Sequence, residues 1–344
     1  MKRYACVLLL LISSAFAQET YDQLRRHWDY DKSAPLDIKE AGVQDREGVK
    51  VHDLSYASPA GDRAKTLGSA AGRVPAYLVV PQGKGPFPAM IYAHWCMPGS
   101  EMRNRKEFLD EALVLARSGV ISLLTDHVEV RSGFVRDQSP LNVQQIDVLV
   151  QQVVDLRRGA DLLLARKDVD PRRLGYAGHS CGGESGAVLS GIDKRFRTFV
   201  ILAGGASDDL MLATPFYKQY RQKIGPDKFD AFAAQYSWTD PGKYLSHAAP
   251  AFVFLQYATD EPVVKPEMAR QYFALVSEPK RFKLYDAPHA LNPEATRDRI
   301  AFLADQLSFK PPDPKAVAAI PALFQPPWPN PLDQPKPKKE SDKK

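Results

Sequence analysis

One stretch of this sequence decides the fold: Arg172-Arg173-Leu174-Gly175-Tyr176-Ala177-Gly178-His179-Ser180-Cys181-Gly182-Gly183. A short apolar strand, Leu174 to Ala177, runs into a segment that fits the pattern Gly-x-Ser-x-Gly. In this pattern a serine occupies a sharp turn between a strand and a helix, and the glycines let neighbouring backbone approach without a Cβ clash. Small residues after the turn can open a helix that packs closely on a sheet. The stretch therefore predicts a strand, a strained turn and a helix, with Ser180 as a nucleophile.

Strand and helix patterns alternate on both sides of this turn. Strands without polar alternation are typical of a parallel sheet that is buried on both faces. The alternation predicts an α/β fold with a mostly parallel sheet covered by helices on both faces. Strands are expected at 74–81, 88–94, 120–125, 174–177, 198–203, 250–257 and 281–286, and helices at 105–117, 144–166, 265–276 and 294–307.

The chain divides into a main domain with two appendages. Its 344 residues are 44% hydrophobic and 25% charged, an ordinary globular composition. A segment rich in aromatic residues is predicted to form a small helical insertion after the sixth strand, either as a cap over the active site or as packing helices at the sheet edge. The predicted divisions are an N-terminal extension at 18–72 with a short helix at 21–28 and a strand at 49–55, an α/β domain at 73–308 with the insertion at 207–249, and a Pro/Lys-rich tail at 309–344.

The two ends of the chain carry separate signals. Lys2 and Arg3 precede the apolar run Val7 to Ile12, and small residues follow it up to Ala17, which predicts a secretory signal peptide cleaved after Ala17. The run is too short to span a bilayer, so the mature chain is expected to have no membrane span and to be secreted or periplasmic. The formal charge of +5 owes much to lysines in the last nine residues, so no nucleic-acid site is inferred. The last part of the tail is predicted to be disordered, while apolar residues before it are free to dock on the domain.

A serine hydroxyl needs a general base to become a nucleophile at neutral pH. Among the seven histidines, His289 directly follows the last predicted strand, where a loop can carry it over the end of the sheet. His289 is therefore the expected base for Ser180. His179, which immediately precedes the nucleophile, is interpreted as a packing or supporting residue.

The base in turn needs a carboxylate that fixes its tautomer. Asp260 follows the strand 250–257 and is the expected partner, while Glu261 is its immediate rival. Asp208 and Asp209, which follow the preceding strand, are weaker substitutes. The chain order of Ser180, Asp260 and His289 is the serine, acid, histidine order of one hydrolase architecture.

Acyl transfer also requires amide donors for the oxyanion. The amide of Cys181 is predicted to be one donor, and the amide of Cys96 the other, with Trp95 as the alternative. Cys96 and Cys181 are the only cysteines left after removal of the signal peptide. Because disulfides persist in exported proteins, we hypothesise a Cys96–Cys181 disulfide that stiffens the oxyanion hole; the alternative is two buried free thiols.

The segment 169–183 together with Asp260 and His289 resembles the α/β-hydrolase superfamily, and the compact layout resembles its dienelactone hydrolase-like and secreted serine aminopeptidase-like branches. The resemblance covers roughly 73–307 and implies an eight-stranded sheet and a triad of Ser180, Asp260 and His289. Two departures stand out: His94-Trp95 replaces the usual His-Gly of the oxyanion loop, and dienelactone hydrolases use a cysteine nucleophile. Dienelactone specificity is thus not supported.

The sequence predicts no metal or other cofactor, because it has neither a His-Glu-x-x-His or Cys-x-x-Cys pair nor a glycine-rich phosphate loop. The predicted function is hydrolysis of a small-molecule carboxylic ester through an acyl-enzyme at Ser180. A peptidase of the same fold is the first alternative. A catalytically inactive binding module is the second.

Overall fold

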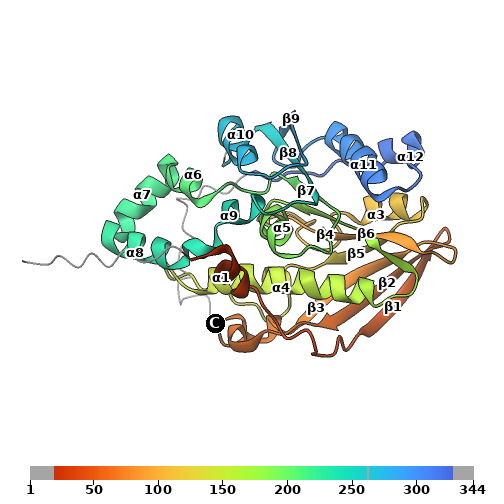
Figure 1. Ribbon diagram of the computed structural model, residues 1–344, viewed down its shortest axis with the longest axis horizontal. Helices are drawn as coiled ribbons and strands as arrows, with labels where there is room; N and C mark the ends of the chain where they lie inside the picture. The colour runs from red at the N-terminus through yellow and green to blue at the C-terminus, as the bar shows by residue number, and fades with distance from the viewer. Residues whose placement is uncertain (1–18, 262, 328–344) are drawn as a thin grey trace, which may run out of the picture.

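A computed structural model of the chain describes residues 19–261 and 263–327. The predicted signal peptide and residues 328–344 of the predicted tail lie outside the described residues. A single sheet runs through the described part, with nine strands in the order β1-β2-β3-β5-β4-β6-β7-β8-β9 (Figure 1). The predicted α/β fold with a mostly parallel sheet is confirmed.

The strands from β4 onward form the parallel part of the sheet, and the first three add an antiparallel edge. The parallel strands are rich in apolar residues because helices cover both of their faces. The bounds are β1 (Lys39–Arg46), β2 (Val49–Ala57), β3 (Arg73–Val80), β4 (Phe87–Ala93), β5 (Ile121–Thr125), β6 (Val169–His179), β7 (Thr198–Leu202), β8 (Phe252–Asp260) and β9 (Lys280–Pro288).

The predicted boundary at residue 73 does not separate two structural units. Strands β1 and β2, which lie in the predicted N-terminal extension, pair with β3 and so continue the main sheet. Trp28 of the same segment is fully buried, and its indole N–H donates to the hydroxyl of Tyr244, 2.8 Å away. The extension is therefore integrated into the fold.

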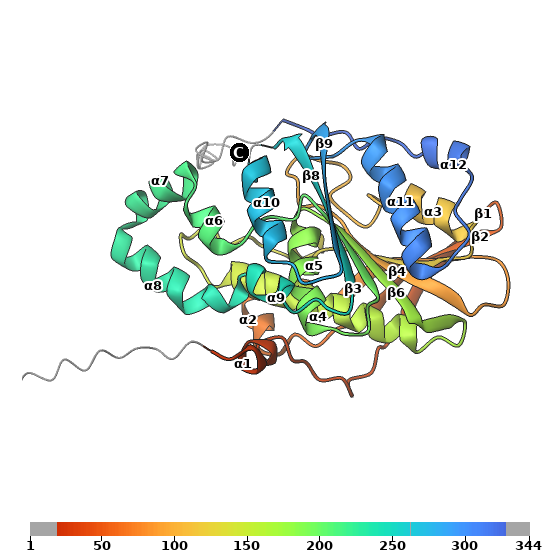
Figure 2. The ribbon, with the colours of Figure 1, turned by 45° about the horizontal axis from the view of Figure 1, so that its top comes forward.

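Two hydrophobic clusters fill the space between the sheet and its helices. Strand β4 shows the division, because Ile91 belongs to one cluster and its neighbours Met90 and Tyr92 belong to the other. Figure 2 shows α3 and α11 on one face and α4 and α5 on the other. The helices outside the insertion are α1 (Tyr21–Arg26), α2 (Ala64–Leu67), α3 (Leu109–Ala116), α4 (Gln144–Leu164), α5 (Cys181–Ile192), α10 (Pro266–Ala274), α11 (Pro293–Leu307) and α12 (Pro314–Ala318).

The predicted helical insertion lies between β7 and β8. Because β1 is an additional strand ahead of the one expected at 49–55, this is after the seventh strand rather than the sixth. Helices α6 (Asp208–Leu212), α7 (Pro215–Ile224) and α8 (Pro226–Tyr236) project beyond the sheet (Figure 1), whereas α9 (Gly242–Leu245) packs into the core against α5. The insertion thus has a packing part, α9, and a protruding part, α6 to α8; the cap role over the active site stays a prediction.

None of the helices within 19–261 and 263–327 has the length and apolar character needed to span a bilayer.

The turn between β6 and α5 is held by close backbone contacts. Ser180 has φ 54° and ψ −117°, and its amide donates to the carbonyl of Leu202 at the end of β7, 2.8 Å away. A Cβ on Gly182 would lie 2.3 Å from the carbonyl oxygen of Ala93 on β4, and one on Gly178 would lie 2.4 Å from the carbonyl oxygen of Gly182. Glycine is required at both positions because the backbones approach so closely.

Replacing Gly182 by alanine is expected to lower the free energy of unfolding by about 1–3 kcal/mol or more, because the added methyl group overpacks the turn against β4. Urea denaturation measures the change. Gly42→Ala is the matched control, since no atom lies within 4 Å of a Cβ built there. Equal stability of the two variants would contradict this account of the turn.

Candidate active site

Ser180 lies where the carboxyl end of β6 meets the first turn of α5 and remains partly accessible to solvent. In parallel sheets the loops at the carboxyl ends of neighbouring strands meet at one edge. The loops after β4, β8 and β9 therefore converge on the serine, and they carry the remaining candidate residues.

His289 and Glu261 form a buried pair at this edge. The Nδ1 atom of His289 lies 2.5 Å from Oε2 of Glu261, and both side chains are almost fully buried. The other carboxylate oxygen of Glu261 accepts the amide of Val263, 3.1 Å away. An ionised carboxylate only accepts hydrogen bonds, so it places the ring proton of His289 on Nδ1 and the lone pair on Nε2.

The predicted pairing of Asp260 with His289 is corrected by this geometry. Asp260 is the last residue of β8 and its side chain is exposed, whereas Glu261 is buried. Successive side chains of an extended chain point to opposite sides, so only one of these two neighbours can face the histidine. Glu261, the alternative considered in the sequence analysis, is therefore the carboxylate partner of His289. Asp208 and Asp209 lie at the start of α6 in the insertion.

Burial lowers the pKa of His289 below its ordinary value, although the hydrogen bond to Glu261 acts in the opposite direction. The imidazole is therefore neutral at neutral pH. A neutral imidazole is the form that can take a proton from a hydroxyl group.

The loop after β4 is fixed by hydrogen bonds at both ends of Trp95. Its amide donates to Oε2 of Glu107 at 2.6 Å, and its carbonyl accepts Nδ1–H of His94 at 2.6 Å. The Nε2 atom of His94 accepts the amide of His127 at 2.9 Å, so this ring is neutral, in line with a pKa that burial lowers. Because Glu107 already takes the Trp95 amide, the alternative oxyanion donor is occupied.

The amide of Cys96 belongs to the same peptide group as the Trp95 carbonyl. In a trans peptide the C=O and N–H groups point in opposite directions, so the His94 contact also fixes the direction of the Cys96 amide. The hypothesised disulfide is confirmed: Cys96 is bonded to Cys181, with Cα atoms 5.8 Å apart. The bridge joins the loop after β4 to the residue that follows Ser180.

His127 lies next to this disulfide. A nitrogen of its ring and the two sulfur atoms all lie within 4.8 Å of one another. The sulfurs are bonded to each other and so offer no thiolates for a metal. The pKa of His127 is lowered well below its ordinary value, first of all by burial.

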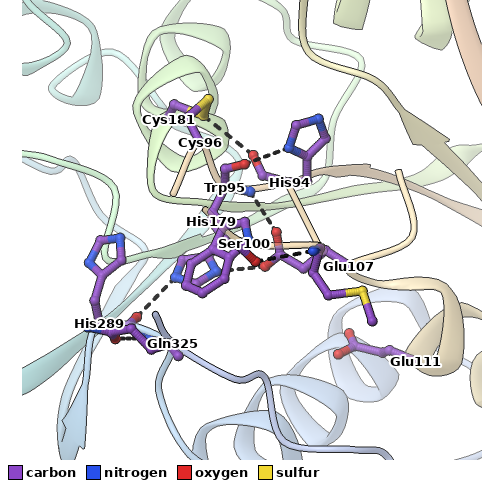
Figure 3. Close-up of polar contacts among 12 residues, drawn as sticks. His94, Trp95, Cys96, Ser100, Glu107, Glu111, His179, Cys181, His289 and Gln325 are labelled. Atoms are coloured by element: carbon purple, nitrogen blue, oxygen red, sulfur yellow. Dashed lines mark hydrogen bonds and ion pairs between the residues drawn. A yellow bond between two sulfur atoms is a disulfide. The ribbon is translucent and has the colours of Figure 1, made fainter. Parts of the chain in front are cut away.

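Glu107 and His179 form a second buried acid–histidine pair, and the sequence analysis did not single out Glu107. The Nδ1 atom of His179 lies 2.6 Å from Oε1 of Glu107, and its Nε2–H donates to the carbonyl of His289, 3.0 Å away. Figure 3 shows these side chains converging with Trp95 between the loops. Glu107 precedes α3 and belongs to no sequence pattern that would single it out.

The described C-terminal segment returns to the same edge. Residues 320–323 line a small pocket together with Glu107, His179 and Leu291. The side-chain oxygen of Gln325 accepts the amide of Ala290, 2.9 Å away, directly after His289. The tail therefore docks beside the site before it leaves the described part of the chain.

Two carboxyl groups with raised pKa values lie in α5 and at the start of the insertion. Burial raises the pKa of Glu184, one turn after Ser180, to about 7, and the nearby charges of Asp240 and Glu129 act in the same direction. Burial likewise raises the pKa of Asp208 to about 7, again with help from Asp240. These groups titrate near neutral pH.

The comparisons with solved structures fit this architecture. Acetyl xylan esterase from Paenibacillus sp. R4 aligns with a TM-score of 0.64 and 18% identity over 83% of this chain and 92% of its own. Acetyl xylan esterase 1 from Thermoanaerobacterium sp. JW/SL YS485 aligns with a TM-score of 0.63 and 16% identity over 83% of this chain and 93% of its own. Glucuronoyl esterase from Solibacter usitatus aligns with a TM-score of 0.57 and 14% identity over 83% of this chain and 92% of its own. The chain has the α/β-hydrolase fold.

Sequence comparison adds one relative of this hydrolase-fold chain. Polyketide transferase ATR5 from Stachybotrys chlorohalonatus (strain IBT 40285) is 24% identical over 255 residues, which are 59% of this chain and 84% of the relative. No protein-family model matches the chain. The dienelactone hydrolase-like branch is not confirmed by these comparisons.

Glu261→Gln is expected to slow the labelling of Ser180 by a fluorophosphonate roughly 10²–10⁴-fold. The glutamine amide would donate to Nδ1 of His289 and force the ring proton onto Nε2, the atom that must accept. Asp260→Asn is the control and should label within about threefold of wild type. Slow labelling of Asp260→Asn together with near-normal labelling of Glu261→Gln would instead make Asp260 the carboxylate partner of His289.

Glu184→Gln is expected to stabilise the protein at pH 8 but not at pH 4. A carboxyl whose pKa is raised on folding contributes its full stability below its unfolded pKa of 4.5, and that contribution is lost as the pH rises through about 7. Removing the ionisation should raise the free energy of unfolding at pH 8 by roughly 1–3 kcal/mol. Urea denaturation at both pH values tests this, with the exposed Glu101→Gln as control; an equal effect at both pH values would contradict it.

Proposed function

We propose that this protein is an exported serine hydrolase that cleaves carboxylic esters through an acyl-enzyme on Ser180. The observation that carries the proposal is the Glu261–His289 pair, which orients a neutral imidazole at the edge of the sheet where the strained turn presents Ser180. The likeness to esterases of the same fold supports it. The disulfide supports export, because such bonds persist outside the cytoplasm.

In the first half of the reaction, Oγ of Ser180 attacks the ester carbonyl carbon while Nε2 of His289 takes the hydroxyl proton. The negative charge moves to the carbonyl oxygen, which the amides of Cys181 and Cys96 would stabilise. The C–O bond of the ester then breaks, and the leaving alcohol takes the proton from His289. The acyl group remains on Ser180.

In the second half, a water molecule attacks the acyl-enzyme and gives its proton to His289. The bond to Oγ breaks, Ser180 recovers its proton and a carboxylic acid leaves. Glu261, hydrogen-bonded to Nδ1, stabilises the imidazolium that forms in each half. An alcohol in place of water would give acyl transfer, and the relative found by sequence comparison bears the name of a transferase.

The test is hydrolysis of p-nitrophenyl esters, from acetate to long chains, and of acetylated sugars, by the mature protein and by Ser180→Ala. Turnover of short esters is expected, with a loss of at least about 10³-fold in Ser180→Ala. A dipeptide p-nitroanilide tests the peptidase alternative, and an added alcohol acceptor tests transfer. If no substrate turns over and no probe labels Ser180, the proposal fails and the result favours the catalytically inactive binding module.

A further inference from the structure

The Glu107–His179 pair joins three segments that carry different parts of the proposed machinery. Glu107 holds the amide of Trp95, next to the expected oxyanion donor, and His179 holds the carbonyl of the expected base, His289. His179 itself immediately precedes Ser180. The two side chains are only 4% and 2% exposed, so their contacts are made away from bulk water.

The hydrogen-bond partners fix most of the protonation of this pair. The carbonyl of His289 can only accept, so Nε2 of His179 carries a proton. Oε2 of Glu107 accepts the Trp95 amide, and the 2.6 Å contact between Oε1 and Nδ1 contains one shared proton. The pair is neutral overall whichever atom holds that proton, so its burial leaves no net charge unpaired.

Aromatic packing reinforces the same arrangement. The Trp95 ring stacks on the ring of His179 with centroids 5.0 Å apart, and it lies nearly parallel to the ring of His289 at 6.3 Å. The Trp95 side chain is fully buried, so it is part of this packing rather than a surface for substrate. A shift of either loop would disturb both the stack and the hydrogen bonds.

We propose that Glu107 and His179 are positioning residues that set the oxyanion loop and the loop of His289 at a fixed distance and orientation from Ser180. This inference rests on the proposed hydrolase function. Neither side chain touches the reacting atoms; each acts through a backbone group of a neighbour. Loss of the pair should misplace the Cys96 amide and the His289 ring together, and misplacement of catalytic groups by about 1 Å is enough to cost about 10²-fold in rate.

Glutamine at position 107 should preserve the arrangement. Its side-chain oxygen accepts the Trp95 amide, and its NH₂ group donates to Nδ1 of a neutral His179, which still donates to His289. Alanine removes both contacts. Phenylalanine at position 179 keeps a ring to stack on Trp95 but removes the donor to the His289 carbonyl.

The experiment measures kcat and KM for a p-nitrophenyl ester, normalised to the sites counted by exhaustive fluorophosphonate titration. Glu107→Ala and His179→Phe are expected to lose about 10–100-fold in kcat per titrated site with KM changed less than about threefold, and Glu107→Gln to stay within about threefold of wild type. A merely structural role would lower the number of titrated sites without lowering kcat per site.

Glu111→Gln is the matched control. Glu111 is a buried acid of α3 that pairs with Arg299 and Tyr92, and its replacement should reduce stability while kcat per site stays unchanged. Unchanged kcat per site in Glu107→Ala and His179→Phe, or an equal loss in Glu107→Gln, overturns the positioning proposal alone. A wild-type protein that neither turns over an ester nor labels at Ser180 overturns the proposed function, and the positioning proposal with it.

Discussion

The close approach of β4 to the turn after β6 is the constraint on which the rest of the structure depends. Ser180 adopts its positive φ in a turn where Gly182 lets α5 begin against the carbonyl of Ala93. The same approach brings the loop after β4 beside the nucleophile. The disulfide between Cys96 and Cys181 can then form, and it keeps the loop that carries the Cys96 amide beside the turn of Ser180. One steric requirement thus places two loops at once.

Polar contacts between buried groups extend this arrangement to the other side of the site. Glu261 orients His289, His179 holds the backbone of His289, and Glu107 links His179 to the oxyanion loop. These contacts give the buried carboxylates of Glu261 and Glu107 and the ring of His179 hydrogen-bond partners, which makes their burial tolerable in a low-dielectric interior. The site is therefore organised by two acid–histidine pairs of different kinds: one orients the expected base, and the other orients the loops.

Two sets of acid groups in the molecule differ in their electrostatics. On the side of α3 the acid groups are matched by histidine or arginine, as in the Glu111–Arg299 pair. On the side of the insertion, Glu184 and Asp208 lie among like charges, and their pKa values rise to about 7. Acid groups of this kind change charge near neutral pH, so this group of carboxyls carries less negative charge in mild acid than in base.

The sequence by itself determined the parallel sheet and the turn at Ser180 and singled out His289, because apolar runs, glycine spacing and a position directly after a strand are local signals. It left a Cys96–Cys181 disulfide as one of two alternatives, and the tertiary structure decided it by bringing together two cysteines that are 85 residues apart. Only the tertiary structure decided between Asp260 and Glu261, since the direction of a side chain at a strand end depends on where the strand stops. It also joined 39–57 to the sheet and brought Glu107 to His179, because contacts between distant segments leave no periodic trace in a single sequence.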